Sequence, residues 1–108
     1  SYFMQSIKFN NNRLSLLDLS SFNKMRFLLN LDLSYNELET LNTEIFDENF
    51  RLKNLKLNNN KLIFLSNGLF KRLFKLEMLN LSTNFIQYIQ KDLFEDLIFL
   101  KHLDLSNN

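Results

Sequence analysis

Leucine recurs along this 108-residue chain in a pattern that repeats every 24 residues. The clearest copy spans residues 52–75 and reads LKNLKLNNNKLIFLSNGLFKRLFK. Its framework positions are Leu52, Leu55, Leu57, Asn60, Leu62, Leu65, Leu69, Phe70 and Leu73. The same framework returns from Leu76 and is already present from Leu28, where Asn49 occupies a leucine position. The chain is therefore predicted to be one tandem array, with repeats at about 4–27, 28–51, 52–75 and 76–99 and a partial repeat at 100–108.

Each repeat begins with a segment that alternates apolar and polar residues, such as Leu55-Lys56-Leu57. This alternation predicts a short β-strand with one buried face. Stacked repeats would place such strands side by side in parallel, about 4.8 Å apart. The spacing of the apolar residues between 69 and 76 suits a loose helical or 3₁₀ segment that returns the chain to the next strand.

A repeat of the form L-x-x-L-x-L-x-x-N-x-L at this length resembles the leucine-rich repeat family. The resemblance implies an α/β solenoid, a horseshoe with a concave parallel β-sheet and an irregular, 3₁₀ or short helical convex side. The repeat length and a recurring phenylalanine are similar to the repeats of animal extracellular proteins, such as Toll-like receptors and adhesion receptors. The resemblance therefore implies a surface that binds other molecules, outside the cell or at its surface.

Two columns of identical residues are predicted to be structural. An asparagine at each strand exit can satisfy backbone groups that the turn leaves unpaired. This asparagine column comprises Asn12, Asn36, Asn60, Asn84 and Asn108. Phenylalanine rings stacked beneath the returning segments would form an aromatic spine on the convex side. This phenylalanine column comprises Phe22, Phe46, Phe70 and Phe94.

Composition narrows the class of protein further. The formal net charge is +1, which gives no indication of nucleic acid as a partner. No run of about 18 apolar residues could span a membrane, and the chain has no cysteine for a disulfide or thiolate site. The array begins and ends inside a repeat without caps, so we expect it to belong to a longer array.

The concave strands carry the first set of candidate binding residues. Outward positions on these strands should face a ligand, and Ser34 and Ser82 are expected among them. The candidates for ligand binding are Lys8, Asp32, Tyr35, Lys56, Met78, His102 and Asp104. The central column alternates in charge, which either relieves repulsion between neighbouring coils or matches a partner of mixed charge.

Apolar residues at positions that should face water form a second set of candidates. Aromatic side chains of this kind are enriched in interaction surfaces, although isolated examples are common on any protein. A lateral patch could include Tyr2 on the returning side, in a column that Arg26 interrupts. The candidates for lateral contact are Phe50, Phe64, Phe74, Phe85, Tyr88 and Ile98.

A single N-x-S/T sequon occurs at Asn80-Leu81-Ser82. In a secretory pathway, Asn80 would carry a glycan on the concave face and would block ligand access near the fourth repeat. In the cytosol, Asn80 would be only a polar strand residue. The same Leu-Ser pair also recurs at Leu33-Ser34 as a framework preference, so the sequon alone leaves both interpretations open.

No set of residues suggests catalysis, a cofactor or a metal site. His102 and Asp104 lie two residues apart on one predicted strand, without a nucleophile or a glycine-rich loop. The first hypothesis is therefore a non-catalytic recognition or adhesion ectodomain that binds a protein or a glycan. The alternatives are an intracellular scaffold, and a structural component whose arrays associate laterally with one another.

Overall fold

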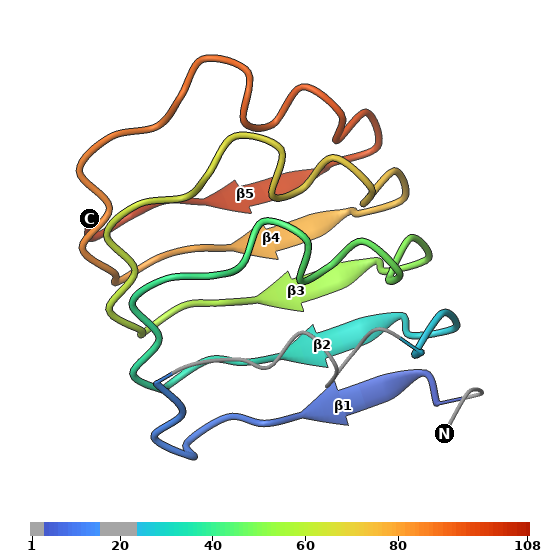
Figure 1. Cartoon of the computed structure of the whole chain (residues 1–108), viewed down its shortest axis with the longest axis horizontal. Coiled ribbons are helices and arrows are strands. Elements are labelled where there is room, and N and C mark those ends of the chain that lie inside the picture. The colour runs from blue at the N-terminus through green and yellow to red at the C-terminus, as the bar shows by residue number, and fades with distance from the viewer. Residues whose placement is uncertain (1–3, 16–23) are drawn as a thin grey trace.

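Five short strands form one parallel sheet in the order of the sequence. The computed structural model describes residues 4–15 and 24–108. Its strands are β1 (Ser6–Lys8), β2 (Asn30–Asp32), β3 (Asn54–Lys56), β4 (Met78–Asn80) and β5 (His102–Asp104), each paired with the next (Figure 1). Every paired residue lies 24 positions from its partner, as for Leu31 with Leu55 and Leu55 with Leu79. The predicted solenoid is confirmed.

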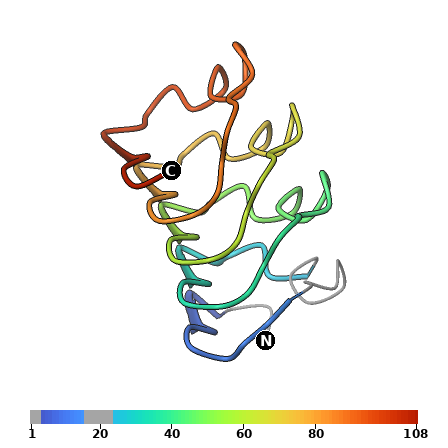
Figure 2. The same ribbon diagram turned by 90° about the vertical axis from the view of Figure 1, so that its left-hand side faces the viewer.

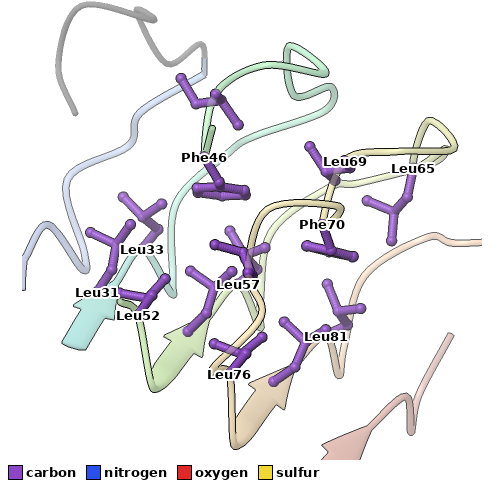
Figure 3. Close-up of a cluster of buried hydrophobic side chains, with 14 of the residues drawn as sticks. Leu31, Leu33, Phe46, Leu52, Leu57, Leu65, Leu69, Phe70, Leu76 and Leu81 are labelled. Atoms are coloured by element: carbon purple, nitrogen blue, oxygen red, sulfur yellow. The ribbon is translucent and has the colours of Figure 1, made fainter. Parts of the chain in front are cut away.

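The sheet and the returning segments form opposite sides of each coil (Figure 2), and the core side chains lie between them (Figure 3). The inward leucine of β2, β3 and β4 is at most 1% exposed, because it packs against neighbouring coils on both sides. At the returning side, Leu52, Leu73 and Leu76 are fully buried. A single coil cannot bury these residues alone, so the stacking of coils creates the core.

The convex side consists of consecutive turns rather than a helix within the described residues. In the second repeat, Ile45 N–H donates to the Asn42 carbonyl, and Asn49 N–H donates to the Phe46 carbonyl. Such bonds three residues apart tighten the chain locally, as in a 3₁₀ turn. Of the expected alternatives for the return, irregular, 3₁₀ or short helical, the described coils use irregular, 3₁₀-like turns.

The buried asparagines join one coil to the next. Nδ2 of Asn60 donates to the carbonyl of Leu57 in its own coil and to that of Leu33 in the preceding coil, at 3.1 and 3.0 Å. The Leu57 carbonyl also accepts from Nδ2 of Asn84, so two asparagines share one acceptor with two lone pairs. Oδ1 of Asn60 accepts from Leu38 N–H at 3.1 Å. The side chains thus form a continuous ladder along the core.

Asn36 and Asn84 make the same set of bonds and are likewise buried. Asn108 bonds in the same way although it is exposed, and Asn12 is exposed in the first described coil. The ladder asparagines are therefore most shielded from water in the middle of the array.

We expect the substitution N60A to lower the free energy of unfolding by about 2–3 kcal/mol, because it leaves the buried N–H of Leu38 without its acceptor. Chemical denaturation followed by circular dichroism measures this loss. The matched control N67A, at an exposed turn position, should change stability by less than about 0.5 kcal/mol. Equal losses in the two variants would contradict the ladder.

Phenylalanine rings form a second line of contacts beneath the convex turns. The rings of Phe46 and Phe70 stack with their centroids 6.4 Å apart, and those of Phe70 and Phe94 with theirs 6.1 Å apart. Phe46 and Phe70 are fully buried, whereas Phe94 is partly exposed. Phe22, the remaining member of this column, lies outside the described residues.

The substitution F70A should destabilise the chain by about 3–5 kcal/mol, because it removes a buried ring that contacts both neighbouring rings. F94A should cost less, since its ring is partly exposed and its described ring contact is with Phe70 alone. Urea unfolding of both variants tests this order. A larger loss for F94A would show that the spine is not organised around its central ring.

Candidate recognition surface

The concave face contains two hollows that both have Met78 at their border. The first, of about 360 Å³, is bordered by Lys8, Asp32 and Lys56 on β1 to β3. The second, of about 520 Å³, is bordered by His102 and Asp104 on β5. Met78 on β4 borders both hollows. The concave candidates therefore lie on one sheet face but divide into two groups, and Tyr35 belongs to neither.

Opposite charges on neighbouring concave strands do not form ion pairs. Asp32 lies beside Lys56 in the sheet register, yet Oδ1 of Asp32 accepts from Ser34 N–H at 3.0 Å and from Ser34 Oγ at 2.6 Å. Within residues 4–15 and 24–108, no ion pair joins members of this central column. Lys8 and Lys56 are exposed. Their ammonium groups are therefore available to a partner.

Charge pairing takes place in other columns. Lys61 pairs with Glu37 at 3.8 Å, and Lys101 pairs with Glu77 at 3.5 Å, each across one coil boundary. Arg26 pairs with Glu48 at 3.1 Å. All three pairs are exposed enough that each contributes little to stability.

The expectation that Ser34 and Ser82 face outward is wrong. Both are buried, at 4% and 9% exposure. Each hydroxyl turns back to a strand residue two positions earlier, Asp32 for Ser34 and Asn80 for Ser82. The strand alternation ends at these turns, so the period of two no longer determines the direction of the side chain.

The same turn sets the acidity of Asp104. The hydroxyl of Ser106 donates to Oδ1 of Asp104 at 2.6 Å, and the Ser106 backbone N–H donates at 3.0 Å. These bonds favour the ionised form and lower the pKa of Asp104 below its ordinary value, the hydroxyl having the larger effect. The stabilisation is complete above the pKa of the unfolded chain and is lost as pH falls through the lower folded pKa.

We expect S106A to raise the pKa of Asp104 towards its ordinary value, because the substitution removes the hydroxyl donor. An NMR titration of the carboxyl carbon measures the midpoint directly. D104N is the control, since an amide oxygen keeps an acceptor in the turn but does not titrate. An unchanged midpoint in S106A would show that the hydroxyl bond does not control the charge.

A column of left-handed residues follows the strands. Asn11, Asn59 and Asn107 adopt φ values of 61°, 58° and 57° there, as asparagine readily does. Tyr35 and Thr83 occupy the same column with φ of 56° and 54°. This conformation is costly for residues other than glycine and asparagine, and such strain is concentrated at functional sites.

Large apolar side chains gather on the segments that follow the strand exits of the third and fourth coils, and Tyr35 lies at the strand exit of the second coil. We call this surface the exit flank, and it comprises Tyr35, Ile63, Phe64, Phe85 and Tyr88. The exposed fractions of these side chains lie between 47% and 63%. Phe85 N–H donates to the Leu62 carbonyl at 2.9 Å and thereby holds the two segments side by side.

The exit flank is not a general property of the repeat. The second coil carries Glu37, Glu39 and Thr40 where the third carries Lys61, Ile63 and Phe64. A hollow of about 440 Å³ lies between Tyr35 and Phe85. Ile63 was not among the sequence candidates, because its column has no second apolar member among the described coils. Phe64, the next residue and itself a candidate, was the available signal.

The other lateral candidates lie on the returning side, and they differ from one another in exposure and contacts. Phe50 is only partly exposed, and Phe74 lies 5.8 Å from the guanidinium of Arg72, measured to the ring centroid. Ile98 is 74% exposed, and Phe99 beside it, which sequence reasoning missed, is 58% exposed. Tyr2, expected in the same column, lies outside the described residues.

Among the described residues, no group of three or more histidine, cysteine, aspartate or glutamate side chains is arranged to hold a metal ion. None of these residues lies in a helix long and apolar enough to cross a membrane. Asn80 lies partly buried on the concave face of β4.

Comparison with known proteins identifies the family to which the coils described above belong. The family model for leucine rich repeats matches residues 50–108, more than half of the chain. The chain belongs to the leucine-rich repeat family. No curated protein has a matching sequence.

Solved leucine-rich repeat structures superpose closely on the array. The leucine-rich repeat domain of APL1B is similar with a TM-score of 0.93 and 27% identity, over 96% of this chain and 31% of that one. The Toll–Spatzle complex of Drosophila contains a chain similar with a TM-score of 0.89 and 28% identity, over 97% of this chain and 14% of that one. This chain thus spans less than a third of either structure's length.

Proposed function

We propose that this leucine-rich repeat array is a non-catalytic recognition module of an extracellular receptor or adhesion protein, and that it binds a protein partner through the exit flank. The observation that carries the proposal is the gathering of Ile63, Phe64, Phe85 and Tyr88 on two adjacent coils. Aromatic and aliphatic anchors of this size commonly supply most of the binding energy of a protein interface.

Two exposed lysines on the concave face support the same function. Lys8 and Lys56 are exposed and lack ion-pair partners among the described residues, so they can act on an approaching partner. Charges beside an apolar patch contribute to encounter rate and specificity more than to affinity. The Toll–Spatzle complex supplies an example of a similar chain described in complex with another protein.

A structural role is the second candidate. Ile98, Phe99 and Phe74 form exposed apolar surface on the returning side, away from the strand exits. Arrays that associate through this side would show a mass that rises with concentration, which light scattering measures.

The double substitution F64S/Y88S should weaken partner binding at least tenfold, because it removes two anchors without disturbing the buried leucines. Partners captured from secreted proteins on the immobilised chain can be identified by mass spectrometry, and Kd measured by calorimetry. The matched control F74S/I98S removes two exposed apolar side chains from the returning side and should bind as the unmodified chain does. If F74S/I98S alone lost partner binding, or if F74S/I98S lost self-association, the result would instead support lateral assembly.

A further inference from the structure

Asn80 combines a sequon with a specific turn at the end of β4. Its Oδ1 accepts from Ser82 N–H at 3.0 Å and from Ser82 Oγ at 2.7 Å. A backbone N–H can only donate, so the side-chain atom that faces Ser82 must be the oxygen. Nδ2 is then the atom directed away from the turn, and it makes no hydrogen bond with any residue in the described part of the chain.

Two aspartates in the same column show what the turn requires. Asp32 and Asp104 each accept the equivalent pair of bonds from the serine two positions later, at 3.0 and 2.6 Å. A carboxylate has no amide hydrogen to donate. The turn therefore needs one acceptor oxygen and nothing from the second atom of the side-chain head. Nδ2 of Asn80 is spare in the folded chain.

The space in front of Asn80 is open. Asn80 borders the 520 Å³ concave hollow together with Met78, His102 and Asp104. Its partners in the sheet register are Lys56 and Asp104, so no aromatic side chain occupies the adjoining positions of its column. A substituent on Nδ2 can extend into this hollow without breaking a bond of the fold.

We infer that Asn80 is an N-glycosylation site whose glycan covers the concave hollow at β4 and β5. An oligosaccharide is transferred from a lipid-diphosphate donor. The bond from its anomeric carbon to the diphosphate oxygen breaks, a bond to Nδ2 forms, the lipid diphosphate leaves, and one Nδ2 proton is released. This inference rests on the proposed extracellular function, because the transfer requires entry into the secretory pathway.

A glycan at Asn80 divides the binding surface. It shields the hollow beside His102 and Asp104, and it leaves the first concave hollow and the exit flank open. Binding through the exit flank then proceeds beside the glycan. Substitutions in the shielded hollow should have little effect on the affinity of the glycosylated chain.

Secretion of the chain from insect cells tests the inference. Intact mass should fall by one glycan on treatment with peptide-N-glycosidase, which converts the asparagine at position 80 to aspartate. The released chain should keep its melting temperature within about 1 °C, because aspartate serves the same turn at Asp32 and Asp104. A mass that the enzyme does not change, or a large fall in melting temperature, would overturn the inference.

Two matched variants make the result specific. N80D should lose the glycan while the turn remains, whereas D32N creates the same sequon with Ser34 two coils earlier and should add a second glycan. A glycan at position 32 in D32N without one at Asn80 would refute the assignment of Asn80 while showing that the equivalent turn can be glycosylated. Glycan occupancy is measured by mass alone. This test therefore gives its result independently of the partner-binding test with F64S/Y88S.

Discussion

The architecture depends on hydrogen bonds between a buried asparagine and backbone groups of its own coil and its neighbours. Each carbonyl of Leu33, Leu57 and Leu81 accepts from two successive asparagines, so every rung joins two coils. Backbone groups at a sharp strand exit have no ladder partner of their own, and leaving them unpaired in the core would cost free energy. The amide removes this cost at the strand exits of the second to fifth coils, where Asn36, Asn60, Asn84 and Asn108 bond to backbone groups of adjacent coils.

This constraint separates side chains that are bonded within the fold from side chains that are not. The asparagine ladder uses its amide groups for the fold itself, and the turns at Asp32, Asn80 and Asp104 each use one side-chain oxygen. Lys8 and Lys56 have no such obligation, and neither do the large apolar side chains of the exit flank. Residues without a structural role are the ones free to meet a partner. In the proposed binding site, the two lysines lie on the concave face and the apolar side chains follow the strand exits.

The family resemblance and the 24-residue register were available from the sequence, because burial of one strand face and stacking of coils leave only one periodic solution. The columns of binding candidates followed from the same period. The exposure of these candidates did not follow from the period. Ser34 and Ser82 were expected to face outward, yet both turn back onto the preceding strand residue, because a local side-chain bond competes with the strand alternation. Charge alternation between Asp32 and Lys56 likewise suggested an attraction that the Ser34 bonds replace.

What the sequence alone determined is the repeat, the buried leucines, and the asparagine and phenylalanine columns, since each is dictated by a residue type returning at a fixed interval. Tertiary structure decided which of the remaining side chains share a surface. Ile63 has no apolar partner in its column, and it comes to lie beside the segment of Phe85 because backbone bonds hold the third and fourth coils side by side. Proximity between columns depends on the path of the chain after each strand, which the repeat period does not specify.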